Sequence, residues 1–176
     1  MPAESSGPTL AVKRQAGASS PRKTQVTSCK APPFSRFLVA DALKDEAFVR
    51  TYFDGELPER KLLYEDPEFG FCILAHASEG ARESQPHDHG PSWAIYGQVR
   101  GETIMSDFAL VEPPGEKQPG KVRLVRSYTL RPGMRIFTTR ATCTRRAAPR
   151  RAGPTRLLRI EGQNLEKIRR PSCRLA

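Results

Sequence analysis

Hydrophobic and polar positions follow different spacings in successive parts of the chain. Residues 1–33 are rich in Ser, Pro, Ala, Lys and Thr and hold few large apolar side chains. Such a segment buries too little surface to offset the entropy lost on ordering, so we predict a disordered tail. Residues 41–52 (DALKDEAFVRTY) carry an apolar stripe at helical spacing, and Asp41 is of a residue type that caps helices. The pattern predicts one short helix there.

Beyond the predicted helix, the apolar positions recur with the shorter period of β-strands. Short apolar or alternating stretches, separated by Pro and Gly, cover residues 61–64, 69–75, 93–99, 102–111, 122–130 and 156–161. Several short strands at a spacing of about 8–12 residues are typical of a β-sandwich or barrel. We therefore predict a single all-β domain over residues 34–170, with residues 171–176 as a tail.

The positive charge is concentrated in one part of the chain. The formal net charge is +10, and residues 117–160 hold 13 basic residues and no acidic one, which leaves the rest of the chain with a net charge of −3. A basic protein can bind nucleic acid through charge alone. Residues 139–152 (TRATCTRRAAPRRA) nevertheless lack hydrophobic periodicity and any aromatic side chain on which a base could stack. Nucleic-acid binding is therefore the least favoured functional hypothesis.

Cysteine spacing and the lack of long apolar runs bear on the compartment. Cys29, Cys72, Cys143 and Cys173 are scattered and form no CxxC pair, unlike the dense cysteines of a disulfide framework. No apolar run approaches the ~18 residues of a membrane helix, and the first residues do not have the pattern of a secretory signal. We expect a reduced, cytoplasmic protein without a membrane segment.

Two histidines separated by one residue are the strongest chemical signal in the sequence. His87 and His89 flank Asp88, and side chains two apart on an extended segment face the same side. Two neutral imidazoles aimed at one point are two thirds of a facial site for a divalent metal. Asp88 would point the other way. The alternative is a pair of ordinary polar side chains near a turn.

The residues around this pair resemble a signature of the cupin superfamily. In residues 86–101 (PHDHGPSWAIYGQVRG), His87 and His89 match the HxH of the first cupin motif and Gly101 matches its closing Gly. Ala94 stands where most cupins carry Glu. Thiol dioxygenases of the cysteine dioxygenase type also lack that Glu. The string PHDHG…W followed by RGE is similar to those enzymes and their small bacterial relatives.

This resemblance implies a cupin double-stranded β-helix, which is a jelly-roll barrel. It also implies a mononuclear non-haem iron centre, with Fe(II) or another divalent metal held by three His, that dioxygenates a small thiol acid. His87 and His89 would be two of the ligands. Cupins often dimerise through edge strands, so the expected partners are a small-molecule substrate and a second copy of the chain.

Four further side chains are candidates for the same site or for its surroundings. If His89 and Ala94 both face inward, strand alternation sends Tyr96 and Gln98 inward too. Tyr96 could hydrogen-bond a substrate or be a core aromatic, and Gln98 could be a pocket amide. Arg82 could clamp a carboxylate or remain a solvated loop residue. His76 is expected to be structural.

The third ligand that the resemblance implies has no counterpart in the chain. A turn suited to the second cupin motif is present at Pro132-Gly133, but no His follows it. Cys143 is a candidate thiolate ligand beyond the turn. An alternative hypothesis is that residues 134–152 are translated out of frame. A codon shifted back by one base, built from the last base of codon 143 and the first two of codon 144, encodes Tyr or His.

The sequence therefore leaves three functional hypotheses open. The resemblance favours an enzyme, a non-haem iron dioxygenase of a small thiol acid that loss of the third His ligand impairs in this chain. The missing ligand favours a non-catalytic cupin that binds a small molecule. Nucleic-acid binding through residues 117–160 is the third hypothesis.

Overall fold

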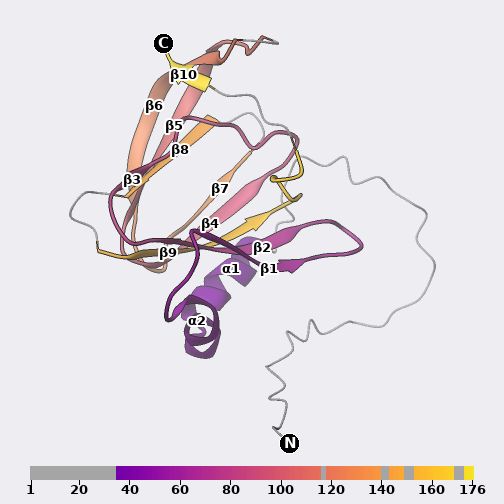
Figure 1. Cartoon of the computed structure of the whole chain (residues 1–176), viewed down its shortest axis with the longest axis vertical. Coiled ribbons are helices and arrows are strands. Elements are labelled where there is room, and N and C mark those ends of the chain that lie inside the picture. Colours follow the sequence, from indigo (N-terminus) through magenta and orange to yellow (C-terminus); the bar gives the residue numbers. More distant parts are fainter. Residues whose placement is uncertain (1–34, 116–117, 140–142, 149–152, 169–172) are drawn as a thin grey trace, which may run out of the picture.

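Two short helices precede two five-stranded β-sheets that face each other (Figure 1). The computed structural model describes residues 35–115, 118–139, 143–148, 153–168 and 173–176. The prediction of an all-β jelly roll with an N-terminal helical segment is confirmed. The tail predicted over residues 1–33 lies outside the described residues. None of the helices in the described part is long and apolar enough to cross a membrane.

The helical segment consists of α1 (Ser35–Lys44) and α2 (Glu46–Phe53) rather than the single helix predicted over residues 41–52. Asp45 separates the two helices, because its backbone is extended and its carboxylate accepts a hydrogen bond from the Phe48 amide at 3.0 Å. This is the geometry of an N-cap, which satisfies an amide that has no partner within the helix. The expected cap at Asp41 is therefore wrong by four residues.

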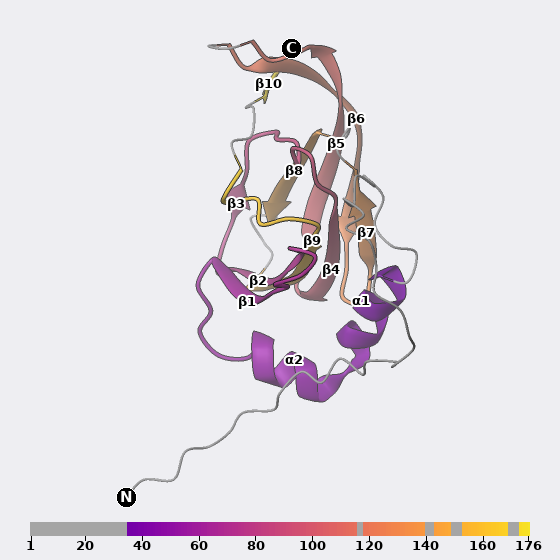
Figure 2. The same cartoon turned by 90° about the vertical axis from the view of Figure 1, so that its right-hand side faces the viewer.

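The first sheet has the strand order β1-β2-β9-β4-β7, and every neighbouring pair is antiparallel. Its strands are β1 (Arg60–Glu65), β2 (Cys72–Ser78), β9 (Thr155–Glu161), β4 (Ala94–Arg100) and β7 (Arg135–Thr138). The helices lie against this sheet on the side away from the second sheet (Figure 2).

The second sheet has the order β10-β6-β5-β8-β3, and only its β10–β6 pair is parallel. Its strands are β10 (Cys173–Leu175), β6 (Gly120–Leu130), β5 (Thr103–Glu112), β8 (Cys143–Ala148) and β3 (Arg82–Glu83). β8 comes from the Thr/Arg/Ala stretch without hydrophobic periodicity, and β10 lies where the sequence predicts a tail. Both become strands because a longer neighbour offers a row of backbone partners.

One hydrophobic cluster holds the helices against the first sheet. Its fully buried members from the helices are Val39 and Phe53, and Ile95 of β4 meets them from the sheet. Gly97 allows the close approach of α1, since a Cβ at this position would lie 2.8 Å from a methyl group of Val39. The outer face of β4 therefore packs against the helices. Because side chains alternate along a strand, the remaining residues of β4 point towards the second sheet.

A second hydrophobic cluster lies between the sheets. It contains Ala94, Tyr96, Met105, Leu130 and Leu157, all of them buried. The cross-strand register shows that polar side chains lie on the same inner face. Tyr96 lies opposite Arg159, and Leu157 lies between His76 and Gln98. The interior therefore combines apolar walls with buried polar groups.

Candidate functional site

The two candidate ligands lie on the segment that connects β3 to β4. His87 pairs with Thr144 of β8 as an isolated antiparallel bridge, with N···O distances of 3.0 Å and 2.8 Å. The His87 and His89 ring centroids are 5.6 Å apart, and the rings are tilted by 60°. The structure thus brings the two imidazoles together, although only His87 has a strand-like partner.

The His87 ring is oriented by its own backbone neighbourhood. Its Nδ1 lies 2.9 Å from the Gln85 carbonyl oxygen, which can only accept, so Nδ1 carries the hydrogen. The lone pair of the neutral ring is then on Nε2, the arrangement that metal-binding histidines commonly have. Asp88 instead accepts a hydrogen bond from the Gly90 amide at 3.0 Å, which shapes the turn.

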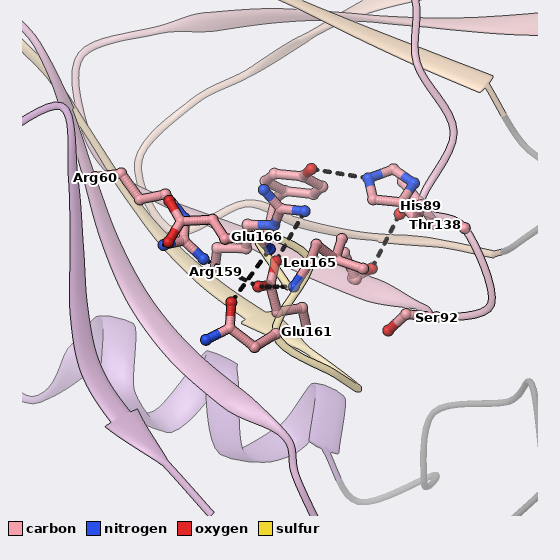
Figure 3. Close-up of polar contacts among 12 residues, drawn as sticks. Arg60, His89, Ser92, Thr138, Arg159, Glu161, Leu165 and Glu166 are labelled. Atoms are coloured by element: carbon pink, nitrogen blue, oxygen red, sulfur yellow. Dashed lines mark hydrogen bonds and ion pairs between the residues drawn. The ribbon is translucent and has the colours of Figure 1, made fainter. Parts of the chain in front are cut away.

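The His89 side chain is fully buried and contacts side chains through both ring nitrogens (Figure 3). The Thr138 hydroxyl donates to the Ala94 carbonyl at 3.3 Å and accepts from Nδ1 of His89 at 3.4 Å. Nε2 of His89 then accepts from the Tyr96 hydroxyl at 3.0 Å. A metal ion at this Nε2 would have to displace the tyrosine.

Tyr96 and Gln98 both face the interior, on the side that alternation predicts. Gln98 is fully buried, and its Nε2 donates to the Arg100 carbonyl at 2.7 Å. Its Oε1 has no hydrogen-bond partner among the described residues. The Tyr96 ring lies under the guanidinium of Arg159, with 5.1 Å from Cζ to the ring centroid. Tyr96 therefore links the histidine pair to a charged cluster on β9.

That charged cluster was not predicted. Arg159 lies 2.9 Å from the carboxylate of Glu161, which is fully buried. The other Glu161 oxygen accepts from Arg60 at 3.2 Å and from the Leu165 amide at 3.1 Å (Figure 3). The available signal was the spacing of Arg159 and Glu161, because residues two apart share one face of a strand.

His76 is buried on the inner face of β2, as a structural histidine would be. It is 6% exposed, and neither ring nitrogen has a hydrogen-bond partner among the described residues. Burial holds its pKa well below the ordinary value, and the nearby cations of Arg146, Arg159 and Arg60 lower the pKa further. The ring is therefore neutral in the folded protein at neutral pH.

Arg82 does not lie in a loop. It belongs to β3, is exposed, and forms an ion pair with Glu59. A positively charged guanidinium that is already paired is a weaker carboxylate clamp than the sequence suggested, although its side chain still lines a small cavity beside His76. A role for Arg82 beside the histidine pair is therefore less favoured than the sequence suggested.

Cys143 lies against another thiol. Its Sγ is 3.5 Å from Sγ of Cys173, and burial raises the pKa of Cys143 to about 12. A thiol with such a pKa is a poor source of thiolate. Within the described ranges, no three His, Cys, Asp or Glu side chains form a group that could hold a metal ion. The described donors therefore do not fit the three-ligand iron centre that the resemblance implies.

Most of the described cations in the basic stretch form ion pairs. Six of the nine described Lys and Arg residues in residues 117–160 pair with carboxylates: Lys121, Arg126, Arg131, Arg145, Arg156 and Arg159. Paired cations attract phosphate less strongly than unpaired ones. Nucleic-acid binding stays the least favoured hypothesis.

Comparisons with known proteins return solved structures of low sequence identity. KdgF from Halomonas sp. matches with a TM-score of 0.45 and 14% identity, over 62% of this chain and 82% of that one. A cupin superfamily protein from Desulfitobacterium hafniense gives 0.43 and 12%, over 62% and 84%. The Cnp3 cupin domain of Schizosaccharomyces pombe gives 0.47 and 6%, over 65% and 72%. No family model matches the chain, and no curated protein matches it.

Proposed function

We propose that this chain is a cupin-type protein that binds a small organic molecule between its two sheets, beside His89 and Tyr96. What supports this is a set of polar side chains buried in a region that otherwise forms an apolar core. Burying polar groups costs free energy unless they find partners. Binding sites for small molecules have this composition, with apolar walls and a few converging polar groups.

Gln98 carries the proposal. Its amide nitrogen is satisfied by a backbone carbonyl, whereas its oxygen is buried without a partner among the described residues. An unsatisfied buried acceptor costs about 1–3 kcal/mol. A ligand with a hydroxyl, amine or amide donor would recover that energy. Met105, Leu130 and Leu157 would supply the apolar contacts.

A thermal-unfolding screen in the presence of EDTA tests this function. We expect one or more small hydroxy, amino or thiol acids to raise the melting temperature saturably, since a ligand at 100 times its Kd stabilises by about 2.7 kcal/mol. Gln98→Leu should retain the fold and lose this response. The control Ile95→Val, on the face of β4 that packs against the helices, should keep it. A response that needs added Fe(II), or that survives in Gln98→Leu, would contradict the proposal.

An iron-dependent thiol dioxygenase is the second candidate, and the pairing of His87 with Thr144 favours it. Residues directly opposite in an antiparallel bridge place their side chains on the same face. Thr144 is 1% exposed, so position 144 lies inside and next to the first imidazole. It is also the position at which the shifted codon would encode Tyr or His. A third imidazole there would complete the set that the resemblance implies.

Substitution at position 144 separates the two candidates. Thr144→His should bind Co(II), used as a spectroscopic probe, at least about tenfold more tightly than the natural chain, which is about 1.4 kcal/mol. Thr144→Gln has a side chain of similar size without imidazole and serves as the matched control. Equal Co(II) affinity in the two variants would remove the iron candidate. Independent sequencing of codons 134–152 would decide whether the frame is intact.

A further inference from the structure

A small polar cavity lies apart from the histidine pair, between β2, β3 and β8. Its volume is ≈ 20 Å³. The side chains that carry its chemistry are His76, Ser78, Arg82, Ser84, Thr103 and Arg146. Space of this size admits about one group of the size of a water molecule. A compact polar group is therefore what the cavity can take.

His76 brings two unsatisfied polar atoms to this cavity. The side chain is 6% exposed, and both ring nitrogens lack a hydrogen-bond partner among the described residues. A neutral imidazole has one N–H donor and one acceptor. In the register of the first sheet, it lies between Arg60 of β1 and Leu157 of β9, neither of which satisfies it. A ligand in the cavity could accept from its N–H.

Arg146 leaves one positive charge at this site. Arg82 is neutralised by its ion pair with Glu59, whereas Arg146 forms no ion pair in the part of the chain that the structure describes. Its backbone amide donates to the Ser84 hydroxyl at 3.0 Å. Burial, together with the nearby Arg159, lowers the pKa of Arg146. An anion beside the guanidinium would offset this unfavourable environment.

We infer that this cavity binds the carboxylate group of a small organic acid, with Arg146 supplying the opposite charge and His76 donating its ring N–H. A single net positive charge matches a monoanion. The inference rests on the proposed function, because it names the class of molecule that binds between the sheets.

NMR titration of the imidazole signals tests the inference directly. The chain has three histidines, so the His76 signals can be assigned by their loss in His76→Leu. Formate is the probe, at an ionic strength held constant with sodium sulfate. Three non-hydrogen atoms permit a Kd no tighter than about 1 mM. We expect formate to shift the His76 signals saturably, and neither neutral formamide nor sulfate to do so.

Two neighbouring arginines of β8 supply the matched variants. Arg146→Gln should weaken formate binding at least about tenfold. Arg145→Gln should leave it unchanged, because the Arg145 guanidinium pairs with Glu83 and lies 5.6 Å from the centroid of the Phe108 ring. If Arg146→Gln does not fold, the titration of the natural chain still decides the matter.

Three outcomes would overturn the inference: His76 signals that do not move with formate, signals that move equally with formamide, or equal weakening in the two arginine variants. Its failure is distinguishable from failure of the proposed function. Stabilisation that depends on Gln98 without any response at His76 would leave small-molecule binding standing and remove this carboxylate site. A formate response at His76 without any Gln98-dependent stabilisation would leave the carboxylate site standing and remove the role proposed for Gln98.

Discussion

Replacing His76 by leucine should stabilise the protein, although His76 is a buried polar residue. Truncating a hydrogen-bonded group normally leaves its partner unsatisfied, but neither nitrogen of His76 has a partner among the described residues. His76→Leu therefore removes a largely uncompensated desolvation cost of about 1–3 kcal/mol and gives up only the weak interaction of the ring with the Glu59 backbone. We expect the unfolding free energy near neutral pH to rise by about this amount.

The same substitution should flatten the pH dependence of stability. The pKa of His76 in the folded protein is well below the ordinary histidine value of 6.5, so the unfolded chain binds one more proton as the pH falls below 6.5. The unfolding free energy then falls with decreasing pH, by at most about 1.4 kcal/mol per pH unit. Between pH 6.5 and about pH 5, the natural chain should lose stability that His76→Leu retains.

Urea unfolding followed by the fluorescence of Trp93, the single tryptophan, measures both effects. The two proteins are compared at about pH 7.5 and about pH 5. His87→Gln serves as a control, because that ring is half-buried and hydrogen-bonded to the Gln85 carbonyl. The reasoning fails if His76→Leu is less stable than the natural chain near neutral pH, or if its stability falls equally towards pH 5.

Four further predictions concern other parts of the interior. Tyr96→Phe leaves Nε2 of His89 without the hydroxyl 3.0 Å away and should cost about 1–3 kcal/mol in a urea titration, with no change in the far-UV spectrum. Glu161→Gln should cost about 3–5 kcal/mol, because it leaves the Arg159 charge uncompensated in the interior, whereas Arg60 keeps its ion pair with Glu166; a loss below about 1 kcal/mol would show that water satisfies Arg159. Leu158→Ala should cost about 2–5 kcal/mol by opening a cavity in the cluster under the helices. Cys143 should react slowly with a thiol reagent at neutral pH until urea unfolds the chain, because burial raises its pKa to about 12; rapid reaction in the native state would contradict the burial.

The strands that the sequence predicts well are those with an apolar period. β4 and β9 were expected at residues 93–99 and 156–161, and they form within one residue of those bounds. β8 had no such signal, since its residues are Cys, Thr, Arg and Ala. Its strand conformation depends on hydrogen bonds to β5 and β3, which are distant in the sequence.

For the candidate site too, the sequence predicted the local features and missed the contacts between distant segments. Spacing alone predicted that the His87 and His89 rings lie close together and, with Ala94 taken to face inward, that Tyr96 faces the interior. It gave no indication that Thr138 lies beside His89, because 49 residues separate them. The helix boundary at Asp45 was missed for a local reason, since two aspartates four residues apart were equally good caps by residue type.

Residue order by itself determined the local features of this protein: where strands alternate, where charge accumulates, and which imidazoles share a side. These depend on backbone geometry over a few positions, so neighbours along the chain are enough to infer them. Only the tertiary structure decided that Arg146 faces His76 across a small cavity, and that no third ligand accompanies the histidine pair among the described residues. Such contacts join strands of different sheets, and their distances are determined by packing rather than by local sequence.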